Sequence, residues 1–444
     1  MFLVLSEIFL NIVQHHVLWG PILESDLKRF NAYAFRVRRY YCQWHGAGDD
    51  VDISAYVHVL RASRRSYIFP RLLDLDVIEA YKDGANTTKI MFLMSPCLHK
   101  FSMSGSSTST AIVLNSLQIT TPHILCLTLR GVAFIDHDVS VICSLSQLQE
   151  ISIFEDNRFE RKSGRWGGEP ALFDLSFFSR LSCKKTLRKF SLHWLYIIQS
   201  DSSIWTVEFP SLESIDLSIT TIGPIADFFC HVMVPGLKEL SIGLGSSPFG
   251  KLIKSTEAQY WNQFFDVIAV ATTTHFKNLK IAGNRSVDFC ECWKGVGLTV
   301  SGFPDFSNLS LETFSIKWPL CSLGQSDLEK VIHSWPYLST LALASCWPSE
   351  LDLMVLVDIA IGLPHLKSLY LSVNKLQCFN QRASLLNHNL QYLFLETFVF
   401  VMEFELAQCI NQIFPHLKNC IFSYHSDLGW ISEDVTSLVQ SAEN

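Results

Sequence analysis

The sequence predicts an α/β solenoid, in which short units of one strand and one helix stack side by side. Three observations predict it: an apolar phrase that recurs along most of the 444 residues, a nearly constant interval between its copies, and helical patterning between them. The phrase is Pro-x-Leu-x-x-Leu-x-Leu in loosened form. Its clearest copies begin at Pro210, Pro235, Pro336, Pro364 and Pro415, and looser ones at Pro70, Pro96 and Pro122.

The first apolar residue of each copy gives the repeat interval. These residues are Leu72, Leu98, Ile124, Leu148, Leu187, Leu212, Leu237, Phe276, Leu311, Leu338, Leu366, Leu390 and Leu417. Most intervals are 24 to 28 residues, which matches the roughly 20 to 29 residues of leucine-rich repeats. The three longer ones, 148–187, 237–276 and 276–311, predict insertions. We therefore expect a leucine-rich repeat solenoid, a ribonuclease-inhibitor-like horseshoe of about 12–13 irregular repeats.

Each repeat is predicted to consist of one strand and one helix. The apolar triplet has period two, which is typical of a strand with one buried face, and the following residues return as a helix that covers the core. One unit cannot bury its own face, so stacking makes the core continuous. Three helices are readable before prolines: the run that opens with a capping-box pattern of Ser326 and Glu329, residues 350–363, and residues 406–413.

The residues before the first strand lack the repeat. Leu27, Phe30, Ala34 and Val37 have helical spacing, and Ile53 to Leu60 reads as a second helix. We expect residues 25–68 to form a helical linker and N-terminal cap, and residues 69–444 to form the repeat domain.

Composition predicts a globular protein of the cytoplasm, the nucleus or both. The chain is 48% apolar and 17% charged, with a formal net charge of -7, so we expect neither nucleic acid nor membrane as a partner. The apolar stretch Met1 to Val13 carries Glu7 and no basic n-region, which disfavours a signal peptide and a membrane span. The 13 cysteines are scattered and are expected to be reduced, buried thiols. The close pair Cys290 and Cys292 lacks a second pair at zinc-site spacing, so no metal or cofactor is expected.

We expect no enzyme activity, because the chain has no Gly-rich phosphate loop, G-x-S-x-G or H-E-x-x-H motif. The pair His15-His16 has no carboxylate or cysteine partner in its segment. A basic run in the 148–187 insertion is either a solvated loop or a contact loop for an acidic partner. Its candidate contact residues are Arg158, Arg161, Arg165 and Trp166.

The concave face offers the candidate binding residues. In each strand the residue between the last two apolar positions, and the one after them, point away from the core. The candidates for partner binding are Arg130, Phe154, His193, Lys317, Tyr370, Phe394, Glu396 and Ile421. Tyr370, Phe394 and Ile421 belong to the last three repeats and are expected side by side, as aromatic interface anchors often are. The alternative is that they pack under the C-terminal end of the chain or are capped by the tail residues Trp430 and Ile431.

The N-terminal residues carry a family resemblance. The string Leu5-Ser6-Glu7-Ile8-Phe9-Leu10-Asn11-Ile12 resembles the first helix of an F-box. Leu18-Trp19 and the segment from Ser25 to Arg38 resemble the junction that follows the F-box in fungal F-box/leucine-rich repeat proteins. The resemblance implies that residues 1–24 form a partial F-box-like helix and junction, with Leu5, Ile8, Phe9 and Ile12 as adaptor-binding residues.

The same resemblance implies a function. It implies a non-catalytic substrate-recognition subunit of a Skp-cullin-F-box ubiquitin ligase, a monomer within its complex, with the Skp adaptor, the cullin and a protein substrate as partners in ubiquitin-dependent degradation. Only the first F-box helix has a counterpart before Trp19. A stand-alone repeat scaffold with no ligase link is therefore the alternative.

Overall fold

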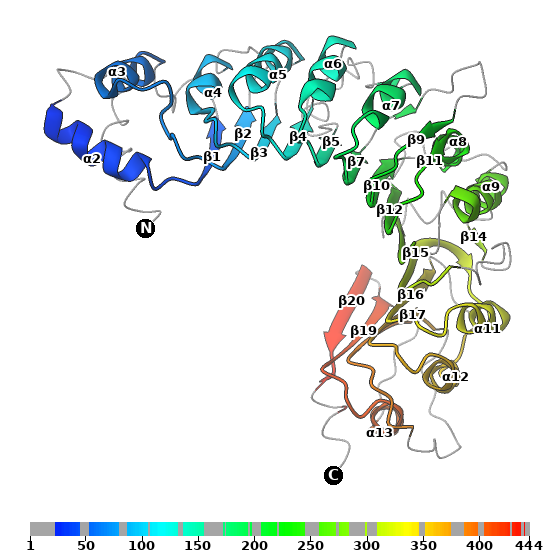
Figure 1. Ribbon diagram of the computed structural model, residues 1–444. Coiled ribbons are helices and arrows are strands. Elements are labelled where there is room, and N and C mark those ends of the chain that lie inside the picture. The colour runs from blue at the N-terminus through cyan, green and yellow to red at the C-terminus, as the bar shows by residue number, and fades with distance from the viewer. Residues whose placement is uncertain are drawn as a thin grey trace. The chain divides into compact units, whose positions relative to one another are not determined.

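The computed structural model divides into two compact units, Met1–Ile198 and Gln199–Asn444. It describes residues 23–44, 53–79, 87–104, 107–131, 136–154, 172–173, 175–193, 196–197, 206–219, 222–244, 257–271, 275–283, 298–299, 309–345, 351–373, 386–397, 404–426, 429–436 and 439. Each unit alternates strands of a parallel sheet with helices that lie along one side of it (Figure 1).

Among the described residues, unit 1 has six parallel strands in chain order. They are β1 (Arg39–Trp44), β2 (Asp74–Glu79), β3 (Lys100–Ser104), β4 (Cys126–Arg130), β5 (Glu150–Phe154) and β7 (Lys189–His193). The helices are α2 (Glu24–Ala34), α3 (Ile53–Ser63), α4 (Thr87–Leu93), α5 (Ser107–Thr120), α6 (Asp136–Ser144) and α7 (Leu175–Ser182). A separate short pair joins β6 (Leu172–Phe173) to β8 (Tyr196–Ile197).

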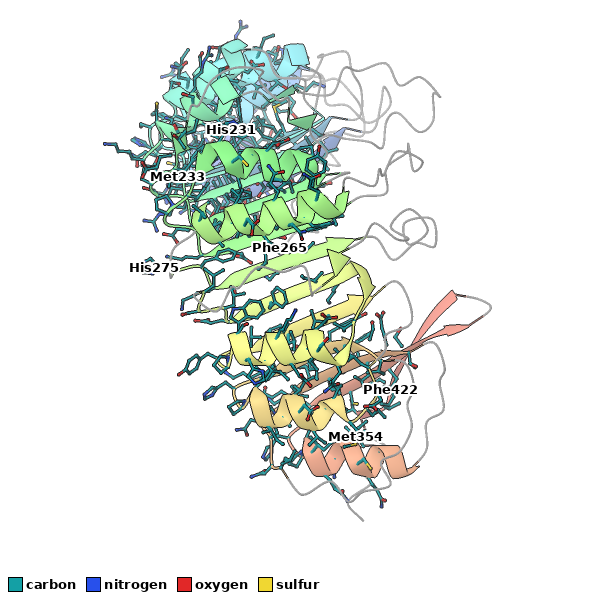
Figure 2. All side chains as sticks on the ribbon, turned by 90° about the vertical axis from the view of Figure 1, so that its right-hand side faces the viewer. His231, Met233, Phe265, His275, Met354 and Phe422 are labelled. Atoms are coloured by element: carbon teal, nitrogen blue, oxygen red, sulfur yellow. The ribbon has the colours of Figure 1, made fainter. Side chains whose placement is uncertain are left out.

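Unit 2 continues the same alternation. Its parallel strands are β10 (Ser214–Ile219), β12 (Glu239–Leu244), β13 (Asn278–Gly283), β15 (Thr313–Ser322), β16 (Thr340–Ser345), β17 (Ser368–Ser372), β18 (Tyr392–Thr397) and β19 (Asn419–Ser426). β20 (Gly429–Asp434) pairs antiparallel with β19, β14 (Leu298–Thr299) pairs with β15, and β9 (Val207–Glu208) pairs with β11 (Val232–Met233). Figure 2 shows its helices in one layer: α8 (Gly223–His231), α9 (Glu257–Ala271), α11 (Gln325–Ser334), α12 (Val355–Gly362) and α13 (Phe404–Ile413).

The fold is a leucine-rich repeat solenoid. The first apolar residue of every predicted copy, from Leu72 to Leu417, is at most 5% exposed. The two later apolar residues of the phrase fall on the strands and align between neighbours: Leu341 pairs in register with Leu369, and Leu369 with Leu393. Each copy therefore begins one strand, and the aligned side chains make a core between the sheet and the helices.

A repeated backbone arrangement fixes the strand register. One carbonyl just before each strand accepts hydrogen bonds from two consecutive N–H groups of the next repeat. The carbonyl of Glu213 accepts them from Lys238 at 2.8 Å and Glu239 at 3.0 Å, and that of Lys238 from Lys277 and Asn278 at 2.9 Å. The carbonyl of His99 in unit 1 does the same for Leu125 and Cys126. Because one acceptor serves two donors in successive repeats, the strands cannot slide without breaking several bonds at once.

The predicted insertion at 237–276 contains a helix rich in aromatic residues. On α9, Trp261 stacks on Phe265 with ring centroids 5.9 Å apart, and Phe264 contacts Phe229 of α8 at 6.2 Å. All four side chains are buried, and Figure 2 labels Phe265 on this helix. The longer interval therefore adds core to the solenoid in this part of the chain.

Three local details differ from the sequence predictions. A strand, β1, lies in the segment predicted as helical linker, because Tyr40 and Cys42 alternate with Arg39 and Tyr41 and pair with β2. The cap of α11 is not made by Ser326 and Glu329: the carboxylate of Asp327 accepts a hydrogen bond from the backbone N–H of Gly324 at 3.1 Å. α12 begins at Val355 rather than near 350, because the Asp352 carboxylate accepts a hydrogen bond from the N–H of Met354 and holds a turn there.

Close helix packing predicts that Gly362→Ala destabilises unit 2. A Cβ at Gly362 would overlap Cγ2 of Ile332 on the neighbouring helix α11, so a side chain there must displace that residue. We expect the free energy of unfolding to fall by about 1–3 kcal/mol, as for other overpacked cores, measured by urea denaturation. In an Ile332→Ala background the same change should cost much less, because the clashing methyl is gone. An equal loss in both backgrounds would contradict this packing.

Candidate functional site

The sheet face turned away from the helices carries the candidate site. Along β4, β5 and β7 buried residues alternate with half-exposed ones, so the alternate side chains stand on the face that the helices do not cover. The structure places Arg130, Phe154, His193, Lys317, Tyr370, Phe394 and Ile421 at such half-exposed positions. Whether a partner binds them stays a prediction.

Three of these residues form a cluster in unit 2, which we call the Tyr370 stack: Lys317, Tyr370 and Phe394. The rings of Tyr370 and Phe394 are parallel within 7°, with centroids 4.2 Å apart. They come from directly paired positions of β17 and β18. The Lys317 ammonium lies 4.1 Å from the centroid of the Tyr370 ring, a distance at which a cation is attracted to the ring face.

Two alanines of β16 allow Lys317 to reach Tyr370. Lys317 pairs in register with Ala344, and Tyr370 pairs with Ala342. The lysine therefore crosses an entire strand, which only small side chains permit. Ala342 and Ala344 are 4% and 0% exposed although they stand on the open face, so neighbouring side chains cover them.

The Tyr370 ring has neighbours within the protein on its faces. Lys317 and Phe394 both lie against Tyr370, so its ring faces are engaged within the protein. Ring edges carry a partial positive charge, which attracts carbonyl and carboxylate oxygens. Ile421 pairs in register with Phe394 and extends the cluster with an aliphatic side chain.

Glu396 does not match the expectation of an open-face residue. It is 1% exposed, and its Oε2 accepts a hydrogen bond from the hydroxyl of Ser372 at 3.0 Å. The side chain thus lies along the sheet toward the neighbouring strand instead of projecting into solvent. Ser372 and Ser423, at the paired positions on either side, are buried as well. This row of the sheet is therefore closed to a partner.

Unit 1 has a second cluster of stacked rings with a nearby cation on its open face. Phe154 and His193, at paired positions of β5 and β7, stack with centroids 4.3 Å apart and an interplanar angle of 12°. The Arg130 guanidinium lies 5.9 Å from the Phe154 centroid and forms an ion pair with Asp76 at 3.7 Å. Asp76 was not among the predicted site residues; its position between Leu75 and Val77 was the available signal.

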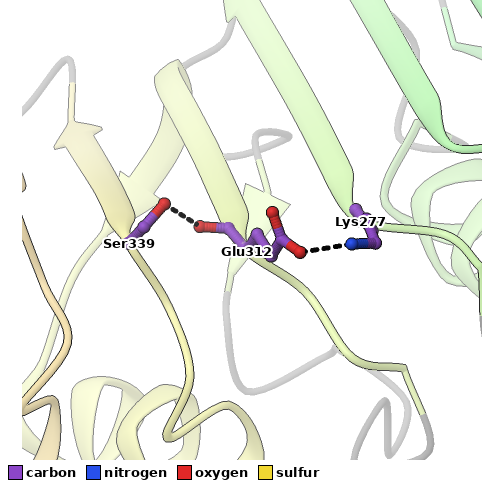
Figure 3. Close-up of polar contacts among 3 residues, drawn as sticks. All are labelled: Lys277, Glu312 and Ser339. Carbon is purple, nitrogen blue, oxygen red and sulfur yellow. Dashed lines mark hydrogen bonds and ion pairs between the residues drawn. The ribbon is translucent and has the colours of Figure 1, made fainter.

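Charged residues near the strand starts pair with one another. Lys277 forms an ion pair with Glu312, whose backbone carbonyl accepts a hydrogen bond from the Ser339 hydroxyl at 2.9 Å (Figure 3). Lys238 pairs with Glu213 at 2.8 Å, and Lys280 with Glu239 at 2.7 Å. Each pair joins neighbouring repeats and is partly exposed, so each contributes at most about 1 kcal/mol. These charges support the sheet and are poor candidates for partner contacts.

Several predicted residues lie outside the described residues. They are the F-box-like Leu5, Ile8, Phe9 and Ile12, and the insertion residues Arg158, Arg161, Arg165 and Trp166. Within the described part of the chain, no group of three or more His, Cys, Asp or Glu side chains gathers as a metal site would need. No helix among the described residues has both the length and the apolar character to cross a bilayer.

The cysteines fit the expectation only in part. Among the described ones, Cys42 and Cys420 are buried free thiols, but Cys97, Cys183 and Cys230 are exposed. The exposed three lie at a turn or near helix ends, where the apolar repeat pattern does not reach. Burial raises the pKa of Cys126 to about 11 and that of Cys420 to about 12, so both stay protonated at neutral pH.

The raised pKa of Cys420 predicts a loss of stability in alkali. Its folded pKa of about 12 exceeds the ordinary value of 9.0, so the stabilisation is complete below pH 9 and is lost as the pH rises toward 12. We expect the urea midpoint of the native protein to fall over this window more steeply than that of Cys420→Ala, which has no thiol to ionise. If the urea midpoints of the two proteins fall equally with pH, burial does not raise the pKa of Cys420.

Comparison with known proteins is limited. No family model and no curated protein matches the sequence. Among solved structures, the chain is similar to an internalin from Listeria monocytogenes, with 14% sequence identity, a TM-score of 0.39 and 92% of each chain covered. The repeat assignment rests on the buried phrase positions and the strand register described above.

Proposed function

We propose that this chain is a non-catalytic binding scaffold whose protein partner docks on the open sheet face at the Tyr370 stack. The parallel stack of Tyr370 and Phe394, with Lys317 held against it, is the observation that carries the proposal. Aromatic residues are frequent anchors of protein interfaces. Rings that are already held in place lose little conformational freedom on binding, so more of the contact energy is retained as affinity.

The chemistry of this face favours a protein partner. The stack joins ring edges, a tyrosine hydroxyl, an ammonium group and the aliphatic Ile421 over adjacent strands. A peptide or protein surface offers carbonyl oxygens and apolar side chains together, which suits that mixture. Replication of one short structural unit also gives an extended surface of the kind that repeat proteins use for binding.

A narrower function, substrate recognition for a Skp-cullin-F-box ubiquitin ligase, is supported by the N-terminal sequence. The resemblance of residues 5–12 to an F-box helix, followed by a junction at Leu18-Trp19, is its basis. In this proposal the repeats hold a substrate and the N-terminal segment binds the adaptor. The chain itself performs no chemistry.

Truncation of the two rings tests the binding proposal. We expect Tyr370→Ala with Phe394→Ala to lower affinity for captured partners by about 2 kcal/mol or more, roughly 30-fold in Kd. Partners are captured on the immobilised native chain from a lysate of the source cells, identified by mass spectrometry and then titrated against each variant.

The matched control is Tyr337→Ala with His365→Ala. These rings also stack, with centroids 5.9 Å apart, and Tyr337 is 70% exposed, but they lie in the turns before β16 and β17. The control should retain binding, and both variants should keep the thermal midpoint of the native chain. Unchanged binding by the Tyr370 and Phe394 variant would remove the stack from the interface.

Co-purification with the adaptor tests the ligase link. When the tagged chain is expressed with the Skp adaptor and the cullin, we expect both to be recovered with it. Ile8→Asp with Ile12→Asp should abolish their recovery, because charges on the apolar face of the F-box-like helix oppose its burial in an interface. If neither protein is recovered with the unchanged chain, the ligase link is wrong and the scaffold proposal stands alone.

A further inference from the structure

The N-terminal part of unit 1 concentrates positive charge. Residues 27–73 contain nine basic side chains against three acidic ones, a local net charge of +6 in a chain of formal net charge -7. The basic residues are Lys28, Arg29, Arg36, Arg38, Arg39, Arg61, Arg64, Arg65 and Arg71. Arg65 is half-buried and the other eight are exposed. The three acidic residues, Asp49, Asp50 and Asp52, lie outside the described residues.

Two of these charges lie over one exposed ring. Phe35 ends helix α2 and is 40% exposed. The Arg65 guanidinium lies 4.3 Å from its ring centroid, and that of Arg71 lies 5.5 Å away. Arg38 donates a hydrogen bond from Nη1 to the backbone carbonyl of Arg71 at 3.2 Å. We call Arg36, Arg38, Arg64, Arg65 and Arg71, with Phe35, the arginine cluster.

One residue of this cluster, Arg64, has a backbone conformation that is unfavourable for arginine. Arg64 has φ of 50°, in the left-handed region where glycine is the usual residue after a helix. The Arg65 N–H bonds the Leu60 carbonyl at 3.1 Å across this turn, and the guanidinium of Arg65 is thereby carried to the Phe35 ring. A cationic side chain therefore occupies a position where glycine would be less strained.

Several lysines elsewhere on the sheet pair with glutamates, but these five arginines have no such partner among the described residues. None of them forms an ion pair with a carboxylate among the described residues. Nη1 of Arg65 is buried and has no hydrogen-bond acceptor among them. Crowded guanidinium groups repel one another, and an anionic partner would relieve that repulsion. Each guanidinium can also hold a carboxylate through two parallel hydrogen bonds.

Carboxylates limit the cluster on two sides. Glu24 and Asp26 lie in the first turn of α2, which places them about 15 Å from Phe35 along the helix. Asp74 and Asp76 of β2 follow Arg71 in the chain and are paired with Arg39 and Arg130. A long polyanion such as nucleic acid would run from the cluster onto these carboxylates. A short anionic segment would not.

We propose that the arginine cluster binds a short acidic segment of a protein partner, with carboxylates on the guanidinium groups and an apolar side chain against Phe35. The proposal rests on the proposed function, since its ligand is a protein. It adds a second surface, distinct in chemistry from the Tyr370 stack.

Fluorescence anisotropy tests this proposal with a labelled ten-residue peptide of Asp and Glu around one central Phe. The full-length chain should bind it, and binding should weaken as added salt shortens the Debye length from about 10 Å at 0.1 M to about 3 Å at 1 M. Arg36→Glu with Arg71→Glu should weaken binding about tenfold or more, since two exposed pairs are replaced by repulsion.

Two further variants separate charge from folding. Arg64→Gly removes one charge and relaxes the left-handed turn, so we expect weaker peptide binding with an equal or higher thermal midpoint. Lys185→Glu with Lys330→Glu, at exposed sites outside the cluster, makes the same change in net charge as the double reversal and should bind nearly as well as the native chain.

Three outcomes would overturn the proposal. The first is that a peptide with Gln and Asn in place of the acids binds as tightly as the acidic peptide. The second is that the Lys185 and Lys330 control loses as much affinity as the Arg36 and Arg71 variant. The third is that a ten-nucleotide single strand or anionic phospholipid vesicles bind more tightly than the acidic peptide. Tyr370→Ala with Phe394→Ala should leave peptide binding unchanged. Absence of peptide binding with intact partner capture would therefore refute the cluster alone, and the reverse would refute the Tyr370 stack alone.

Discussion

Burial of the apolar strand residues between neighbouring repeats is the interaction on which the rest of the structure depends. A single repeat leaves its strand edges and one apolar face unsatisfied, and only the next repeat provides both. The shared carbonyls, such as that of Glu213, then fix the register. A slip of one residue would send the core side chains to the open face and the open-face side chains inward. Tyr370 and Phe394 stack because Leu369 and Leu393, one residue earlier, are aligned in the core.

The repeat positions could be predicted because the same apolar residues that recur at a nearly constant interval are also the ones that become buried. The phrase alone located the strands from β2 to β19 that carry its copies, and it indicated that Tyr370 and Phe394 would be neighbours. It could not predict β1, whose Tyr40 and Cys42 alternate without a proline or a leucine phrase. Nor could it predict the burial of Glu396, whose carboxylate accepts a hydrogen bond from the Ser372 hydroxyl of the adjacent strand. The arginine cluster escaped prediction because its members are separated by up to 35 positions, from Arg36 to Arg71, and the contacts of Arg65 and Arg71 with Phe35 form only in the fold.

Electrostatics divides the described charges into two groups. Pairs such as Lys238 with Glu213 and Lys277 with Glu312 join successive repeats, so their charges are neutralised where the strands begin. A chain with a formal net charge of -7 has enough carboxylates to pair its arginines in the same way. The arginine cluster nevertheless keeps two guanidinium groups over one ring, and one of the two follows a left-handed residue. Selection for stability alone would favour glycine at Arg64.

The two surfaces would respond differently to solution conditions because their physical basis differs. Contacts at the Tyr370 stack derive from apolar area and ring edges, which salt screens little, and its one cation is already held against a ring. Contacts at the arginine cluster derive from exposed charges, which salt screens strongly and which mainly raise the association rate. A partner that depends on the cluster should therefore lose association rate as salt increases, whereas one that depends on the stack should keep both its rate and its affinity. The salt dependence of one binding reaction thus reports which surface carries it.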